Sequence, residues 1–275
     1  MNKILVNGSE QSHIDVRDRG LQYGDGLFET IAYKNGQMQL WDEHMQRMQQ
    51  SAERLSLAIA DESLWLDDIK RLNLSSDAVI KLTLTRGISG RGYVYGNNDP
   101  TSRISAAYSW PEYAESNSFG VTTCLCETPV SVNSALAGIK HLNRLDNVLA
   151  RNEWNDTHIT EGFMFDHNKH VIEGTMSNVF CVLDDELYTP SLENSGVAGV
   201  MRQHVIKLAE KNNIPVNIIE ISEQNFLNMD SVFITNSLIG VWPVTKILVD
   251  DQQFDFPIAE HVKTIQACLN DSLNK

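Results

Sequence analysis

The sequence is short of basic residues, and this shortage excludes one large class of proteins. Its 275 residues include 22 lysines and arginines against 36 aspartates and glutamates, which gives a formal net charge of −14. A protein that binds the phosphate backbone of nucleic acid needs a basic surface, so we expect no nucleic-acid partner. The charge still permits an anionic small-molecule substrate, provided that a few arginines gather in one cleft.

Long apolar runs and paired cysteines are also missing. No apolar run is long enough to cross a membrane, and the first residues lack the apolar core of a signal peptide, so we expect a cytoplasmic protein without a membrane partner. The cysteines lack the second Cys/His pair of a zinc site, so we expect reduced thiols and no metal; they are Cys124, Cys126, Cys181 and Cys268. Hydrophobic residues make up 42% of the chain, enough for a sizeable core.

Local patterns in the first half predict strands interleaved with two helices. The expected strands cover 3–6, 28–33, 78–85 and 104–110, and the expected helices cover 43–58 and 62–72. Asp42 is expected to cap the first helix. A polar, irregular stretch at 111–118 is the candidate linker. We therefore place an N-terminal α+β domain at 1–112, an interdomain linker at 113–119 and a C-terminal domain at 120–275.

The second half is predicted to contain more strands, with helices between and after them. The pattern indicates a strand at 120–127, hairpins over 162–173 and 179–188, a helix at 201–212, strands at 231–235 and 244–249, and a C-terminal helix from about 257. Leu142, Leu145 and Leu149 recur at helical spacing, so we expect a helix after Lys140 with one buried face.

Lys140 is the first candidate functional residue. It follows a small apolar lead-in, Ala137 to Ile139, and would stand at the mouth of that helix. Burial lowers the pKa of a lysine and makes it a usable base or Schiff-base nucleophile. The alternative is a lysine that extends to solvent from the start of the helix.

Three further features belong with this lysine. Glu173 is an acid at a strand end, Gly199 precedes a helix whose N-terminus can bind an anion, and Arg47 lies on the first helix. Alone, each has an ordinary alternative: a solvated turn carboxylate, a plain junction of loop and helix, or an arginine facing water. Together they match what pyridoxal phosphate needs, namely a lysine, a carboxylate at the pyridine nitrogen and a phosphate cup.

Ordered motifs along nearly the whole chain give the sequence a family resemblance. They are Asp18-Arg19-Gly20, Tyr23-Gly24-Asp25-Gly26, Gly138-Ile139-Lys140, Glu173-Gly174 and Ser177-Asn178-Val179-Phe180. The sequence resembles the class IV aminotransferase family of pyridoxal-phosphate enzymes. The resemblance implies a two-domain α+β fold of the D-amino acid aminotransferase type, and a homodimer with sites near the subunit interface.

The same resemblance assigns roles to residues at matching positions. Lys140 would bind the cofactor covalently, and Glu173 would lie at the pyridine nitrogen. The implied phosphate contacts are Arg47, Val200, Met201 and Ser237, with Asn236 beside the last. The aminotransferases usually have a threonine where Ser237 stands, so the hydroxyl is kept.

Within the family, three strings are similar to those of lyase members that act on 4-amino-4-deoxychorismate. The strings lie at 137–145, 86–93 and 199–203. The implied reaction forms 4-aminobenzoate and pyruvate, a step of folate biosynthesis. The implied substrate contacts are Arg91, Tyr93 and Asn143, and Thr30 is a further catalytic candidate.

Other functions stay open at this stage. A D-amino acid or branched-chain amino acid aminotransferase would share the lysine and the cofactor. The carboxylate-binding arginine and histidine of D-amino acid aminotransferases correspond here to Arg91 and Tyr93, and the tyrosine expected of branched-chain enzymes is missing from 141–151. A binding protein that keeps the fold without catalysis is a third possibility. A phosphate-sugar binder using the same helix terminus is a fourth, and it leaves Lys140 unexplained.

Overall fold

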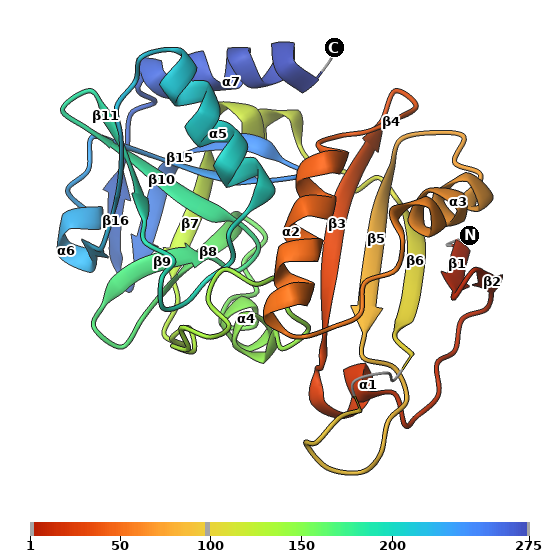
Figure 1. Cartoon of the computed structure of the whole chain (residues 1–275). Coiled ribbons are helices and arrows are strands. Elements are labelled where there is room, and N and C mark those ends of the chain that lie inside the picture. Colours follow the sequence, from red (N-terminus) through yellow and green to blue (C-terminus); the bar gives the residue numbers. More distant parts are fainter. Residues whose placement is uncertain (1–2, 97–99, 274–275) are drawn as a thin grey trace. The chain divides into compact units, whose positions relative to one another are not determined.

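The computed structural model describes residues 3–96 and 100–273, and the chain divides into two compact units (Figure 1). Unit 1 contains the residues up to Glu112 together with Ile139–Asn143. Unit 2 contains Tyr113–Gly138 and the residues from Arg144 onward. The segment Ile139–Asn143, which includes Lys140, therefore belongs with the N-terminal half of the chain, although the sequence pattern placed it in the C-terminal domain.

Unit 1 is built on one antiparallel sheet of six strands. In spatial order the strands are β2 (Ser9–Glu10), β1 (Lys3–Val6), β6 (Ser102–Ser109), β5 (Ala78–Thr85), β3 (Gly26–Lys34) and β4 (Gln37–Met38). A short helix, α1 (Arg19–Tyr23), precedes β3. Two longer helices, α2 (Trp41–Arg54) and α3 (Glu62–Leu72), lie in front of the sheet in Figure 1.

The core of unit 1 follows from the alternation of side chains along β3. Leu27, Glu29 and Ile31 share one face of the strand and stand opposite Leu84, Leu82 and Ile80 of β5. The leucines and isoleucines of this face pack in one core with Met45, Met48 and Ala52 of α2. Burying each large apolar side chain contributes about 1.5–3 kcal/mol. One acidic residue, Glu29, thus lies in the row of apolar residues that faces α2.

Three elements of unit 1, namely β1, α3 and β5, have the predicted bounds, and one expectation is wrong. α3 covers Glu62–Leu72 and β5 covers Ala78–Thr85, as the sequence pattern predicts. Asp42 does not cap α2, because the helix begins at Trp41 and its N-cap, Leu40, has a left-handed backbone with φ 55°. Asp42 lies in the first turn instead, where its charge favours the positive end of the helix.

Unit 2 contains a mixed sheet of ten strands. The spatial order is β12 (Val216–Ile219), β11 (Glu186–Pro190), β10 (Asn178–Leu183), β14 (Ser231–Asn236), β15 (Gly240–Val249), β7 (Val121–Leu125), β8 (Ile159–Phe165), β9 (His170–Gly174) and β13 (Ile221–Ser222), with β16 (Gln252–Asp255) paired to β15. The helices are the 3-10 helix η1 (Glu115–Phe119), α4 (Leu145–Arg151), α5 (Val200–Lys211), α6 (Glu223–Phe226) and α7 (Glu260–Leu273). Short elements such as α6, β13 and β16 left no clear pattern in the sequence.

Helix α7 confirms the predicted C-terminal helix, although it begins at Glu260 rather than near 257, and it buries one apolar stripe. Val262, Ile265 and Leu269 are all buried. Elsewhere in unit 2, the rings of Phe180 and Phe233 stack with centroids 4.9 Å apart. Across the described ranges, no helix combines the length and the apolar character needed to cross a membrane.

The expectation that a helix with one buried face directly follows Lys140 is wrong. α4 begins only at Leu145, and Leu145 and Leu149 of the expected buried stripe are 68% and 55% exposed. Lys140 lies instead in a segment that pairs with β3: Phe28 N–H donates to Lys140 O at 3.0 Å, and Leu142 N–H donates to Gly26 O at 3.0 Å. Backbone groups that bond to a strand are not available to a helix, so pairing with β3 keeps Leu142 out of the helix, while Leu145 and Leu149 lie on α4.

Candidate active site

Glu173 lies near the end of β9 and is buried, with 5% of its surface exposed. Its Oε2 accepts a hydrogen bond from Val197 N–H at 2.8 Å. Gly196 has a positive φ of 79°, and a Cβ added there would lie 3.4 Å from the same Oε2. The structure therefore contradicts the alternative of a solvated turn carboxylate: this acid is held against the loop that precedes α5.

A second buried carboxylate, Glu161 on β8, supports the turn that follows Glu173. Its Oε1 accepts from Thr175 N at 3.0 Å and Thr175 Oγ1 at 2.5 Å, and its Oε2 accepts from Met176 N at 3.1 Å and Ser177 Oγ at 2.8 Å. These hydrogen bonds fix the turn between β9 and β10. Sequence reasoning missed Glu161, although hydroxyl residues directly after an acidic strand end were a usable signal.

The N-terminus of α5 has the form of an anion site. Its N-cap, Gly199, has no side chain to occupy the first N–H groups, and Val200 and Met201 open the helix. A Cβ at Gly199 would fall 1.9 Å from Asn178 Oδ1, so a larger residue there would displace the Asn178 side chain. Asn178 Nδ2 also donates to Val197 O at 2.9 Å, which ties the loop before α5 to β10.

The other two phosphate candidates lie at the end of β14. Asn236 is the last residue of that strand, and Ser237 follows it. The side chain of Asn236 organises the turn: Nδ2 donates to Met176 O at 3.1 Å, and Oδ1 accepts from Leu238 N at 2.8 Å. Asn236 thus connects this turn to the one that Glu161 supports.

The chain before Lys140 runs beside the loop that holds Glu173. Gly138 N–H donates to Gly196 O at 2.9 Å, and Ala198 N–H donates to Gly138 O at 3.0 Å. Gly138 and Val197 form a parallel bridge, and Val197 is the residue whose N–H holds Glu173. Lys140 follows Gly138 by two residues.

In unit 1, Lys140 and Thr30 are associated with the face of β3 turned away from the core. The Nζ of Lys140 lies 4.5 Å from the ring centroid of Phe28, and the Nζ of Lys81 lies 5.2 Å from the same centroid. Thr30 shares the Phe28 side of β3 by alternation and pairs with Lys81. An aromatic face attracts an ammonium group, so Phe28 helps to place both lysines.

Arg47 is held by Glu29, the acidic residue in the apolar row of β3. Its Nε donates to Glu29 Oε1 at 2.8 Å, its Nη2 donates to Glu29 Oε2, and His44 Nδ1 lies 2.6 Å from Oε2. Burial by itself would raise the pKa of Glu29, but the charge of Arg47 and the hydrogen bonds from His44 and Arg47 lower that pKa to about 2. Glu29 is thus ionised at neutral pH and orients the guanidinium that the family resemblance implies for the phosphate. Sequence reasoning missed Glu29.

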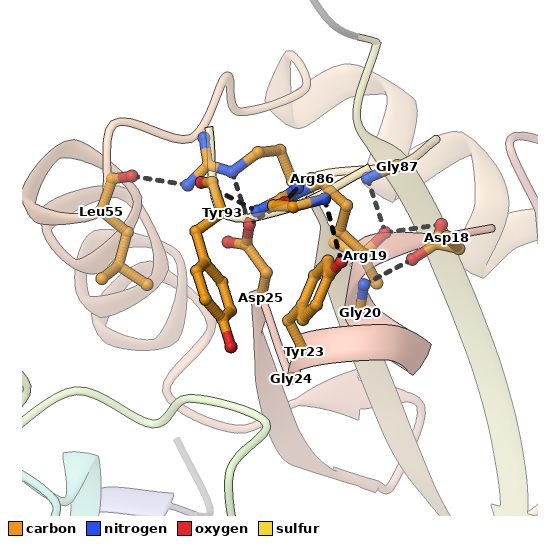
Figure 2. Close-up of polar contacts among 12 residues, drawn as sticks. Asp18, Arg19, Gly20, Tyr23, Gly24, Asp25, Leu55, Arg86, Gly87 and Tyr93 are labelled. Atoms are coloured by element: carbon orange, nitrogen blue, oxygen red, sulfur yellow. Dashed lines mark hydrogen bonds and ion pairs between the residues drawn. The ribbon is translucent and has the colours of Figure 1, made fainter. Parts of the chain in front are cut away.

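The remaining candidates in unit 1 lie on or near the loop after β5, shown in part in Figure 2. Arg91 and Tyr93 are exposed, and Tyr93 packs against Tyr23 with ring centroids 5.6 Å apart. Asn143 Nδ2 donates to Gly24 O at 3.0 Å. Asn143 thus has a structural contact in addition to its predicted role with substrate.

Comparison with known proteins identifies the family. The model of the class IV amino-transferase family matches residues 26–247, and the chain belongs to that family. An aminodeoxychorismate lyase of Vibrio harveyi is 37% identical over 268 residues, which cover 96% of this chain and 98% of that protein. A D-alanine aminotransferase of Listeria monocytogenes is 30% identical over 256 residues, 89% of this chain and 87% of that protein.

Solved structures agree on the fold. A 4-amino-4-deoxychorismate lyase from Pseudomonas aeruginosa superposes with a TM-score of 0.93 at 37% identity, covering 99% of this chain and 100% of that one. A branched-chain amino acid aminotransferase from Escherichia coli gives a TM-score of 0.85 at 25% identity, covering 99% and 94%. The predicted α+β fold of this family is confirmed.

The residues present fit the cofactor on which this family depends. Pyridoxal phosphate needs an amine, an acid and an anion site. Unit 2 supplies a buried carboxylate at Glu173, and nearby an α5 N-terminus without a side-chain cap. Unit 1 supplies Lys140 and the oriented guanidinium of Arg47. Together these residues supply the amine, the acid and the anion-binding groups that pyridoxal phosphate needs.

Proposed function

We propose that the protein is a pyridoxal-phosphate-dependent aminodeoxychorismate lyase, which converts 4-amino-4-deoxychorismate to 4-aminobenzoate and pyruvate in folate biosynthesis. The observation that carries this proposal is the 37% identity to the Vibrio harveyi lyase over 96% of this chain and 98% of that protein. The D-alanine aminotransferase of Listeria monocytogenes is more distant, at 30% identity.

Lys140 and Glu173 would hold the cofactor, one through its amine and the other at the ring nitrogen. Bound there, pyridoxal phosphate supplies an electron sink for the carbon that bears the substrate's amine. The covalent chain supports this assignment. Two peptide units keep the Cα of Lys140 within about 7.6 Å of the Cα of Gly138, and Gly138 bridges Val197, the hydrogen-bond partner of Glu173.

The phosphate of the cofactor would bind to the backbone N–H groups at the start of α5 and to the charged side chain of Arg47. Val200 and Met201 would donate through their backbone N–H groups at the start of α5. Arg47 would supply the charge-assisted hydrogen bonds, in a geometry set by Glu29. Ser237 would add its hydroxyl, with Asn236 shaping the turn.

For the substrate, the chain offers a base and an anion-binding arginine. Lys140 Nζ would take the proton from the carbon that carries the amine and would return a proton to the departing ether oxygen. Arg91 would bind a substrate carboxylate, because its planar fork of donors matches that group. Thr30, Tyr93 and Asn143 complete the proposed set of contacts.

Product identity tests the proposal against an aminotransferase. We expect purified protein loaded with pyridoxal phosphate to release 4-aminobenzoate and pyruvate from 4-amino-4-deoxychorismate in equal amounts, without any oxo acid present. D-alanine with 2-oxoglutarate provides the matched assay for amino-group transfer. Turnover of that pair with no release of 4-aminobenzoate would overturn the lyase assignment in favour of a D-amino acid aminotransferase.

The family resemblance also suggests how the protein is assembled and where it acts. We expect a cytoplasmic homodimer, so light scattering should give twice the chain mass of 30.9 kDa. A mass of one chain at assay concentration would contradict this expectation.

A further inference from the structure

Two arginines of unit 1 share one carboxylate oxygen at a largely buried position (Figure 2). Arg19 Nε and Arg86 Nε lie 3.0 Å and 2.8 Å from Asp25 Oδ2. The side chains of Arg19 and Arg86 are only 4% and 7% exposed. Burying two cations on one carboxylate is costly unless their remaining donors are satisfied. The partners of those remaining donors therefore indicate the role of the cluster.

The remaining donors of Arg19 go to the loop after β5. Nη1 donates to Gly92 O at 2.7 Å, and Nη2 donates to Tyr93 O at 3.3 Å. The guanidinium also lies over the ring of Tyr23, 4.7 Å from its centroid. The hydroxyl of Tyr23 accepts from Gly92 N–H at 3.3 Å. Both backbone groups of Gly92 are therefore held, immediately beside Arg91.

Arg86 anchors the start of the same loop. Its Nη1 and Nη2 donate to Ser56 O and Leu55 O, each at 2.8 Å, which ties the end of β5 to the residues that follow α2. The ring of Tyr95 lies over its guanidinium at 3.7 Å. The loop 87–95 is thus fastened at both ends, through two guanidiniums that meet at Asp25.

We propose that Arg19 and Asp25 are positioning residues for the substrate, because they hold the loop 87–95 in the form that presents Arg91 and Tyr93. This inference rests on the proposed function, in which those two side chains contact the substrate.

The composition of the loop explains why it needs such a clamp. Gly87, Gly90 and Gly92 give the segment a large backbone entropy, and Gly87 and Gly92 have positive φ values of 74° and 95°. Tyr93 is 83% exposed, so its contact with the Tyr23 ring buries little of its surface. Without the Arg19 fork, ordering of the loop would have to occur when substrate binds, and the affinity for substrate would fall.

The test combines kinetics with proteolysis. Arg19→Ala should raise the KM for 4-amino-4-deoxychorismate by about tenfold, with a smaller change in kcat and unaltered absorbance of the bound cofactor. Trypsin cleaves after arginine, so cleavage at Arg91 reports on the loop itself. We expect the variant holoenzyme to be cut at Arg91 about tenfold faster than the parent.

Two further variants separate positioning from general stability. Arg19→Lys keeps a cation beside Asp25 but loses the fork to Gly92 O and Tyr93 O. It should therefore recover thermal stability while its KM and tryptic cleavage stay raised, which also keeps the test valid if Arg19→Ala does not fold. Arg17→Ala removes an exposed arginine bonded to Asp15 two residues away, and it should match the parent in all measurements.

The outcomes are distinct. Unchanged KM in Arg19→Lys, with or without faster cleavage at Arg91, would overturn the positioning role. A parent protein that shows no lyase activity would overturn the proposed function instead, and cleavage at Arg91 would still decide whether Arg19 clamps the loop.

Discussion

Four acids, two in each unit, accept hydrogen bonds from two kinds of donor. In unit 1, Glu29 accepts from Arg47, Asp25 accepts from Arg19 and Arg86, and each acid fixes an arginine. In unit 2, the hydrogen bonds that Glu161 accepts come from backbone N–H groups and hydroxyls. Glu173 likewise accepts from a backbone N–H, that of Val197.

This difference suits the separate tasks of the two halves. An acid bonded to an arginine loses most of its field but gains a charge-assisted bond that orients the cation. A carboxylate that accepts from neutral donors keeps more of its field for another partner. Glu29 and Asp25 of unit 1 therefore orient guanidiniums, and under the proposed function Glu173 of unit 2 would favour a protonated ring nitrogen.

The largest expected effect comes from the lysine that unit 1 contributes. Lys140→Ala should lower turnover by more than about a thousandfold and remove the visible absorbance of the bound cofactor, because no amine remains to bind it or to move the proton. Lys81→Ala is the matched control, since Lys81 also lies against Phe28. A coloured, active Lys140→Ala protein would refute the assignment.

The acid of unit 2 should matter next. Glu173→Gln keeps the size of the side chain but removes its charge, so turnover should fall by about a hundredfold or more while affinity for pyridoxal phosphate changes less. Absorbance titration and steady-state kinetics measure the two quantities separately. Glu210→Gln on the exposed side of α5 serves as control. Parent-like turnover in Glu173→Gln would remove the proposed role at the ring nitrogen.

The acid of unit 1 should reveal itself in the pH dependence of stability. Because the pKa of Glu29 is lowered from 4.5 to about 2, its contribution is complete above about pH 4.5 and is lost as the pH falls toward 2. Glu29→Gln should lower the free energy of unfolding by about 3 kcal/mol at neutral pH, since it also leaves Arg47 without its anion.

Urea unfolding at several pH values measures this contribution. The difference in stability between parent and Glu29→Gln should shrink from pH 4.5 downward. A difference that is the same at pH 7 and pH 3 would mean that Glu29 is not ionised in the folded protein.

Glu161→Gln should have the smallest effect of the four. Its amide group would point two hydrogens at donors that now meet a carboxylate, and we expect a loss of about 1–3 kcal/mol. Thermal unfolding measures the loss, and turnover should fall less than in Glu173→Gln. An equal fall in turnover would show that the turn beneath Glu173, rather than the charge of Glu173, sets the rate.

Local patterns in the sequence predict the elements whose residues act over short range. Helix α3 ends where its apolar spacing ends, and its N-cap Asp61 accepts from Ser63 N–H as a capping residue should. The stripe of α7 and the alternation of β5 likewise depend on neighbours along the chain. The motifs around Lys140 and Glu173 were found because their residue types carry the chemistry directly.

What the sequence could not supply depends on contacts between distant residues. Leu145 and Leu149 lie on a helix as their spacing predicts, yet both are exposed, and the segment before them pairs with β3. Glu29 looks like a polar residue on a strand until α2 brings Arg47 and His44 to it. Arg19 meets Gly92 across 73 positions of sequence, a separation at which periodicity carries no information.

The most direct test of the central claim is to locate the cofactor on the chain. Borohydride reduction of the purified holoenzyme fixes a lysine-bound pyridoxal phosphate, and peptide mass spectrometry then identifies the lysine. We predict the phosphopyridoxyl group on Lys140 at close to one per chain. Label on Lys81, which lies against the same Phe28 ring, or no label at all, would contradict the account.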